Sequence, residues 1–240
     1  MLKKITLIPF ILTLAVISGC GGGKMVLKPD ALNQVKTVAL LQIPEPPYRM
    51  MNLGSPAGAL GAIGAVTIAL NGEEAVKSID GVVSENNFAF GDNLTNEIAA
   101  QLEKSGFKVN IVAVERAENK LLEDYNTVSA DGADALIDVI VSNAGYVTEH
   151  FMFSPEWRPE ARAMISMRAT DNSEVIYSET LMYGYHNPIM SGTDLDAAEE
   201  YKFEKEEAVF EAGDKVVLAG LQDAIESIAS HVATQLRKQN

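Results

Sequence analysis

Short apolar runs alternate with amphipathic stretches along most of the chain. The first of these runs, KTVALLQI at 36–43, is rich in aliphatic residues and predicts a buried strand. It ends at PEPP, residues 44–47, because proline cannot donate a backbone hydrogen bond to a neighbouring strand. Leucine and isoleucine then recur every four residues within 92–106, which predicts a helix with one apolar face.

The middle of the chain predicts more strands than helices. Segment 107–114 alternates apolar and polar residues and predicts a strand, and 115–125 is expected to form a short helix. The apolar run 133–147 predicts a strand although it contains Asp138. Two alternating stretches flank Asp-Asn-Ser within 161–185, and this pattern predicts an antiparallel hairpin.

The last part of the chain is acidic and then amphipathic. Segment 194–207 is expected to lie on the surface, exposed to solvent. Apolar residues recur after it at helical spacing, and the stripe ends in Arg237 and Lys238, whose charges suit the C-terminal end of a helix. The order of elements predicts one α/β domain over 35–240, with a single mixed β-sheet covered by helices and a C-terminal amphipathic helix.

The glycine- and alanine-rich segment 52–72 fits neither a strand nor an ordinary surface helix. All but one of the residues in 57–70 are small or aliphatic, and Gly58, Gly61 and Gly64 recur at every third position. Because a glycine stripe lets a second backbone come close, these glycines are a candidate interaction surface. The alternatives are a helix or loop buried in the domain, or an insertion that touches a membrane without spanning it. The spacing differs from the G-x-G-x-x-G of a dinucleotide-binding turn.

The N-terminal residues follow the order of a secretory signal. A basic start, Met1-Leu2-Lys3-Lys4, precedes an apolar run over 5–17, and small residues follow it up to Cys20, the single cysteine of the chain. This pattern predicts that 1–19 is a signal peptide.

The four residues Ile17-Ser18-Gly19-Cys20 resemble the lipobox of bacterial lipoproteins. The resemblance implies cleavage before Cys20 and attachment of diacylglycerol and a further fatty acid, such as palmitate, to that residue. Several acyl chains hold a protein stably on a bilayer. Gly21 in place of an aspartate implies the outer membrane, with the domain facing the periplasm. Residues 20–34 would then be the lipidated N-terminus and a flexible tether.

The charge of the chain limits its partners. It has 33 acidic and 19 basic residues and a net charge of −14. Removal of 1–19 takes away two lysines and leaves 17 basic residues, so the net charge becomes 17 − 33 = −16. An excess of negative charge repels nucleic acid and anionic lipid head groups, so we expect no nucleic-acid partner and attachment to the membrane through lipid alone.

Four stretches within 36–185 resemble, in order, the core of a broad group of envelope lipoproteins: KTVALLQI, FGDNLTNEIAAQLEKSGFKVNIVAVERAE, GADALIDVIVSN and ARAMISMRATDNSEVIYSETLMYGY. The group includes the curli secretion channel, the penicillin-binding-protein activator LpoB and uncharacterised lipoproteins, and its fold is like the N-terminal domain of TolB. The resemblance implies a TolB-like α/β core in the cell envelope. The long pore-forming hairpins of the curli channel and the long leash of the activator are not evident in this sequence.

Residues typical of catalysis or metal binding form no recognisable set. Cys20 is assigned to the lipid, and the sequence has no G-x-S-x-G motif. His150, His186 and His231 have no partner at metal-ligand spacing and are expected on the surface or in packing. Asp138 is expected to face solvent at a sheet edge; the alternative is a buried carboxylate with a partner. We therefore expect no catalytic residue, no cofactor and no metal, and a protein that is not an enzyme.

Three aromatic residues follow the strand at 133–147. Phe151, Phe153 and Trp157 stand next to Arg158 and would suit a partner contact if they were exposed. The alternative is that they close one end of the core.

These features favour a non-enzymatic envelope lipoprotein that binds another envelope component or itself. The first alternative is a subunit of an oligomeric outer-membrane export or secretion complex. The second is a periplasmic hydrolase or ligand carrier, which would need a deep pocket with converging polar side chains.

Overall fold

The structure is a computed structural model, and it describes residues 25–52, 78–116, 118–130, 132–148, 156–171, 174–185 and 192–237. The signal peptide predicted at 1–19 lies outside these residues, as do Cys20, the three glycines of the candidate interaction surface (Gly58, Gly61 and Gly64), Phe151, Phe153, His150 and His186.

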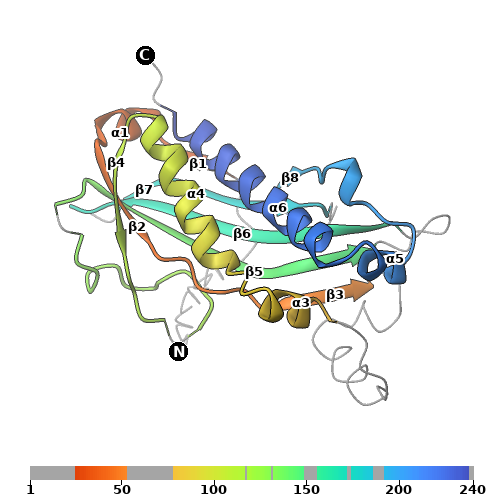
Figure 1. The fold of residues 1–240 in the computed structure, drawn as a ribbon. Helices are drawn as coiled ribbons and strands as arrows, with labels where there is room; N and C mark the ends of the chain where they lie inside the picture. The colour runs from red at the N-terminus through yellow and green to blue at the C-terminus, as the bar shows by residue number, and fades with distance from the viewer. Residues whose placement is uncertain are drawn as a thin grey trace, which may run out of the picture.

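The described chain forms one mixed eight-stranded sheet with helices packed on it, as the hydrophobic pattern predicts (Figure 1). Three long strands make its centre: β5 (Ala135–Thr148), β6 (Trp157–Ala169) and β7 (Val175–Tyr183). They pair antiparallel in chain order. The hairpin predicted within 161–185 and the strand predicted at 133–147 are thereby confirmed.

Strand β5 has two different parallel partners on its outer side. Its first half pairs with β2 (Thr37–Leu41), which pairs in turn with β4 (Lys108–Val112). Its second half pairs with β3 (Tyr48–Asn52), a strand that the sequence did not predict. The prolines at 44–47 therefore end β2, and the chain resumes pairing directly after them.

The opposite edge of the sheet is made by two short strands on β7. These are β1 (Val26–Leu27), which is antiparallel to β7, and β8 (Thr193–Leu195), which is parallel to it. Strand β8 overlaps the start of segment 194–207, which was expected to be exposed surface chain, and a short 3₁₀ turn (Glu199–Tyr201) follows it.

The flexible tether predicted for 20–34 is wrong from Val26 onward. After β1, the chain forms helix α1 (Pro29–Gln34). The Lys28 amide donates a hydrogen bond to the Ile176 carbonyl (2.9 Å), and Leu32 is buried in the core. Backbone pairing and one apolar side chain thus tie this segment to the domain.

Two long helices cover one face of the sheet (Figure 1). They are α4 (Phe90–Lys104), close to the helix predicted at 92–106, and α6 (Asp214–Gln235), the predicted C-terminal amphipathic helix. They pack against each other, and shorter helices flank them: α3 (Ile79–Glu85) and α5 (Glu206–Glu211). A Cβ atom at Gly220 of α6 would collide with the Tyr146 hydroxyl, so this glycine lets α6 lie close to the sheet.

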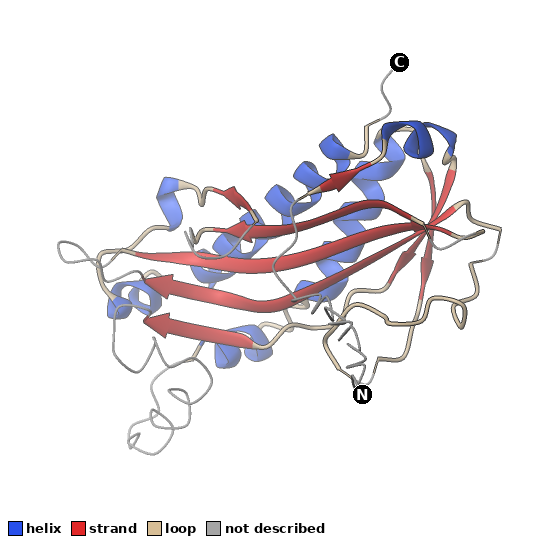
Figure 2. Cartoon of the chain, turned by 180° about the vertical axis from the view of Figure 1, so that it is seen from behind, coloured by secondary structure: helices blue, strands red, loops and turns tan. Residues whose placement is uncertain are grey.

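The other face of the sheet is turned toward the viewer in Figure 2, with α4 and α6 behind it. At the β2–β4 end of this face, the chain between β4 and β5 packs over the strands and makes a second, smaller core. This core contains Ala39, Leu41, Tyr125, Ala133 and Leu136.

The short helix predicted at 115–125 is wrong, because the described residues of that segment form an irregular loop. Their polar groups bond to the sheet and to each other. The Leu122 amide donates to Asp138 (2.8 Å), and the Asn119 side chain donates to the Val141 carbonyl (2.7 Å). These bonds replace the bonds that a helix would make within itself.

Candidate functional site

Arginine side chains gather on the face of the sheet that α4 and α6 leave uncovered. Alternate residues of β6 pack into the main core beneath the helices, from Ala161 to Met167. The residues of β6 that alternate with this core-facing set point the other way, and they include Arg158, Arg162 and Arg168. In β3, Tyr48 and Met50 pack against the main core, so Arg49 also points to the opposite side.

We call this set the arginine face: Arg49, Arg116, Arg158, Arg162 and Arg168. It holds five of the six arginines in the sequence, although the whole chain has a net charge of −14. The arginines, unlike the thirteen lysines, are therefore concentrated on one side of an acidic protein.

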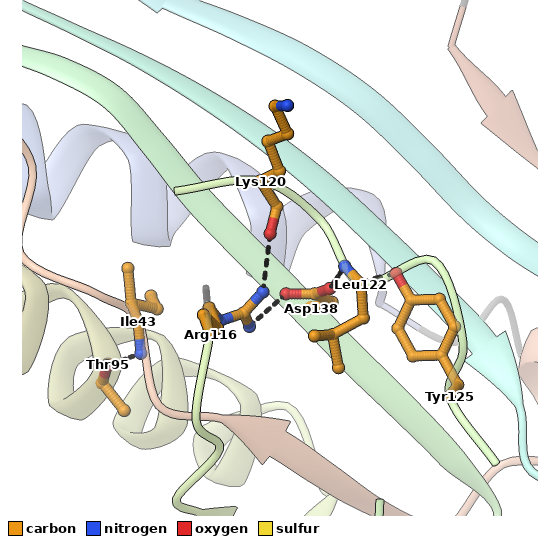
Figure 3. A network of polar contacts seen from close by, with 7 residues as sticks. All are labelled: Ile43, Thr95, Arg116, Lys120, Leu122, Tyr125 and Asp138. Atoms are coloured by element: carbon orange, nitrogen blue, oxygen red, sulfur yellow. Dashed lines mark hydrogen bonds and ion pairs between the residues drawn. The ribbon is translucent and has the colours of Figure 1, made fainter. Parts of the chain in front are cut away.

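Arg116 is held at one end of this face by Asp138 (Figure 3). Its Nη2 lies 2.5 Å from Asp138 Oδ1, and the two side chains are 5% and 0% exposed. The other carboxylate oxygen, Oδ2, accepts hydrogen bonds from the Leu122 amide (2.8 Å) and the Tyr125 hydroxyl (3.0 Å). The expectation that Asp138 faces solvent is wrong: the loop between β4 and β5 covers it and supplies its partners.

The same network joins Arg168 to the loop. The guanidinium of Arg168 lies over the Tyr125 ring, 5.0 Å from its centroid, at a distance suited to a cation–π contact. Burial, followed by the charge of Asp138, raises the pKa of Tyr125 to about 12. Its hydroxyl is therefore protonated at neutral pH and can donate to the carboxylate. This end of the arginine face fastens the loop to the sheet.

Glu160 lies on the same face near the other end, and it is 5% exposed. A bulge in β5 between Val141 and Asn143 shifts the alternation of that strand, so that Asn143 Nδ2 donates to Glu160 Oε2 at 2.5 Å. Burial raises the pKa of Glu160 to about 7, although the Asn143 hydrogen bond and the charges of Arg162 and Arg49 act in the opposite direction.

Gly145 makes the close approach of β3 at this place possible. It pairs with Arg49 on one side and with Glu160 on the other. Its φ is +153°, and a Cβ atom there would collide with the Arg49 carbonyl oxygen. With no side chain at Gly145, Arg49 and Glu160 lie next to each other across the strand.

The helix-covered face holds a different polar cluster. Glu179 points from β7 toward α6, where His231 Nε2 lies 3.0 Å from its Oε2. The hydroxyls of Tyr177 and Thr193 also donate to this carboxylate. Burial raises the pKa of Glu179, but the hydrogen bonds from His231, Thr193 and Tyr177 outweigh it and hold the pKa below its usual value. His231 thus has a packing role, as expected, although its carboxylate partner was not foreseen.

An open cavity of about 690 Å³ lies beside this cluster, between α4, α6 and the segment that contains β8. We call it the acidic groove, because five carboxylates line it: Glu97, Asp194, Asp196, Asp223 and Glu226. No lysine or arginine is among the described residues that line it. Within the described ranges, no group of three or more His, Cys, Asp or Glu side chains is placed to hold a metal ion.

Trp157 does not offer the interaction surface proposed for it. It is 4% exposed and belongs to the main core, and its amide and carbonyl pair with Phe203 (2.6 and 2.8 Å). This residue closes one end of the core, whereas its neighbour Arg158 is partly exposed on the opposite face. Sequence reasoning did not single out Arg158, Arg162 and Arg168, whose separations of four and six residues place them on one side of this strand.

In the part of the chain that the structure describes, none of the helices has both the length and the apolar character needed to cross a membrane.

No protein-family model matches the chain, and no curated protein matches it. Among solved structures, a PelC dodecamer from Paraburkholderia phytofirmans aligns with 90% of this chain and 99% of its own, at 13% identity and a TM-score of 0.39. A hemagglutinin homologue from Helicobacter pylori, described as putative and neuraminyllactose-binding, aligns with 85% of this chain and 87% of its own, at 10% identity and a TM-score of 0.39. A DUF330 protein from Xanthomonas campestris covers 83% and 84%, at 11% identity and a TM-score of 0.37. Likenesses at these TM-scores carry no argument about function or assembly.

Proposed function

We propose that this chain is a non-enzymatic envelope lipoprotein, anchored in the outer membrane by acyl chains on Cys20 and facing the periplasm, where it binds another envelope component or further copies of itself. The observation that carries the proposal is the complete lipobox Ile17-Ser18-Gly19-Cys20. Several acyl chains on one residue give an anchor that does not depend on a membrane-spanning helix.

The start of the folded domain supports a position close to the bilayer. Strand β1 begins at Val26, six residues after Cys20. A fully extended chain spans about 3.3–3.6 Å per residue, so the domain would lie within roughly 20 Å of the acylated residue. A domain held this close to the bilayer would bind partners that lie at the surface of the same membrane.

The polar clusters favour binding over catalysis. Asp138 and Arg116 are used to fasten a loop, and Glu179 and His231 are used where β7 packs against α6. The acidic groove is open and polar, and its five carboxylates stand among uncharged residues with no lysine or arginine in the described lining. Groups of this kind are suited to electrostatic recognition of a partner.

The lipid anchor is tested by replacing Cys20 with alanine in the full-length chain. Wild-type protein is expected in the outer-membrane fraction, with a mature N-terminal peptide whose mass includes diacylglycerol and a further fatty acid on Cys20. Cys20→Ala is expected to appear as soluble or uncleaved precursor protein. Lys24→Ala, which leaves the four lipobox residues intact, is the matched control. Unchanged fractionation and processing of the alanine variant would reject the anchor.

A further inference from the structure

We infer that Arg49 and Arg162 form a binding site for a phosphate group, which their two guanidinium groups hold between β3 and β6. The site lies over Gly145 of β5, the strand between them, at a position that has no side chain. The inference does not depend on the proposed lipid anchor.

The other three members of the arginine face already have partners. Arg116 is paired with Asp138. Arg168 lies over the Tyr125 ring, and Arg158 also has an interaction partner. The proposed site therefore excludes these three side chains.

Arg49 and Arg162 keep most of their hydrogen-bonding capacity. Arg49 is exposed, and Arg162 is partly exposed. In the described part of the chain, neither guanidinium makes a hydrogen bond or an ion pair, and both act on Glu160 only through their charge. The Nε atom of Arg162 is buried and has no hydrogen-bond partner among these residues. A guanidinium carries five N–H donors, and a buried donor without an acceptor is unfavourable, so an anion there would improve the environment of Arg162.

Both guanidinium groups lie close to one point on the sheet. Arg49 pairs with Gly145, and Gly145 pairs with Glu160 on its other side. Arg162 is two residues beyond Glu160 on the same side of β6. The charges of both arginines act to lower the pKa of the Glu160 carboxyl, so both lie near that one carboxyl. An anion above Gly145 is therefore flanked by arginines from two strands.

The chemistry of the ligand follows from the presence of two guanidinium groups. Guanidinium groups form paired hydrogen bonds with the oxygens of carboxylates and phosphates. A carboxylate has two oxygens, which one guanidinium occupies, whereas a phosphate monoester or free phosphate has at least three acceptor oxygens that two guanidinium groups can share. The site should therefore prefer a phosphate group.

Glu160 couples the site to pH. Its side chain is buried, its pKa is about 7, and a negatively charged ligand nearby favours its protonated form. The charged side chains of described residues that face it are Arg49 of β3 and Arg158 and Arg162 of β6, and arginine does not titrate in this range. Binding should therefore be accompanied by uptake of a proton at Glu160 and should strengthen as the pH falls through 7.

The experiment measures binding to the full-length, detergent-extracted protein by isothermal titration calorimetry. The probes are inorganic phosphate, glycerol phosphate as a phosphate monoester on a larger molecule, and acetate as a carboxylate. Wild-type protein is expected to bind a phosphate probe more tightly than acetate. Tighter binding of glycerol phosphate would assign the site to a phosphate monoester, and tighter binding of inorganic phosphate would assign it to the free ion.

The first variants remove one guanidinium at a time. Arg49→Gln and Arg162→Gln should each weaken phosphate binding by about tenfold or more, because each removes charge-assisted hydrogen bonds. Arg162→Lys, which keeps the charge without the paired donors, should also weaken it. Arg237→Gln is the matched control, because it removes the same charge from an exposed arginine just after α6, and it should bind as wild-type protein does.

Glu160→Gln is expected to gain binding, a result that a damaged fold could not produce. Glutamine stays neutral, so at about pH 8 this variant should bind sulfate several-fold more tightly than wild-type protein, if bound sulfate raises the pKa of Glu160 by about one unit. Sulfate replaces phosphate in this measurement because its charge is constant over this pH range. At about pH 6, where most wild-type molecules hold the proton, the two proteins should bind alike.

Four results would overturn the inference. Wild-type protein could bind neither phosphate probe, or it could bind acetate as tightly as phosphate. Arg49→Gln and Arg162→Gln could bind phosphate as wild-type protein does. Glu160→Gln could show no gain at about pH 8, and the bound anion would then lie away from Glu160. None of these results affects the lipid anchor, which the Cys20 variant tests separately.

Discussion

The two faces of the central sheet are stabilised in different ways: one by apolar packing and the other by paired charges. On one face, aliphatic side chains of β5 and β6 pack beneath α4 and α6. On the other, the same strands present arginines and acids, and an irregular loop covers part of them. The first face gains stability from apolar area removed from water. The second depends on every buried charge having a partner, because an unpaired buried charge is costly.

The two buried glutamates make this difference measurable. Glu160 has an amide donor, with arginines nearby, and its pKa is raised to about 7. Glu179 has three hydrogen-bond donors, and its pKa is lowered. Glu160 carries the larger burial penalty and has fewer hydrogen bonds to its charged form, and both differences place its pKa above that of Glu179. The faces should therefore respond in opposite ways to pH.

The largest effect is expected at Asp138. Replacing it with alanine leaves the Arg116 guanidinium buried without its carboxylate, and breaking one partner of a buried pair typically costs about 3–5 kcal/mol. Urea unfolding of Asp138→Ala and wild-type protein measures this. Glu118→Ala removes an exposed ion pair with Lys120 in the same loop and is expected to leave the free energy of unfolding unchanged within error. Equal effects of the two changes would show that the loop network does not stabilise the fold.

The next effect is the pH dependence of Glu160→Gln. The folded-state pKa of Glu160 is raised from 4.5 to about 7, so below pH 4.5 both states hold the proton. Between these values the unfolded state releases the proton first, and the free energy of unfolding falls as the pH rises. Glutamine has no proton to release in this range, so the variant does not lose this stability. Above pH 7 its free energy of unfolding should therefore have risen, relative to that of wild-type protein, by up to about 3 kcal/mol. A difference that stays constant across this pH range would contradict the assignment.

The smallest effect is expected for Glu179→Gln, and its sign is opposite. The folded-state pKa is lowered, so the stabilisation by the carboxylate is present above pH 4.5 and is lost as the pH falls through the folded-state value. The variant should be less stable than wild-type protein by about 1 kcal/mol above pH 4.5, as for one weakened hydrogen bond, and the gap should close in acid. Thr193→Val, which removes a single donor to this carboxylate, should show the same pattern with a smaller amplitude. If the difference in free energy of unfolding between wild-type protein and Glu179→Gln widens in acid, the pKa of Glu179 is raised in the folded state, as that of Glu160 is.

Hydrophobic pattern was sufficient for the elements of the aliphatic face. The spacing of Leu94, Ile98 and Leu102 predicted α4 because all three side chains lie on one face of the helix and are fully buried in the main core. The alternation around residues 171–173 predicted the β6–β7 hairpin for the same reason. Patterns of this kind report which side of an element is apolar, and on this face that is the property that decides the fold.

The charged face was much harder to predict, because its structure depends on contacts between distant segments. The segment 115–125 has helical propensity, yet it forms a loop in which Arg116 and Leu122 bond to Asp138 of β5. The bulge between Val141 and Asn143 changes which residues of β5 share a face, and no pattern in the local sequence predicts it. The spacing of Arg158, Arg162 and Arg168 was visible, but it acquires meaning only once β6 is known to have a side without helices.

The short pairing of β1 with β7 has a mechanical consequence. Only two residue pairs join these strands, Val26 with Ser178 and Leu27 with Tyr177. If the chain is pulled from a lipid at Cys20, tension enters the domain through β1, and these few bonds carry the load before any of the central strands. The edge strand would then peel away and lengthen the leash, while the body of the domain stayed folded.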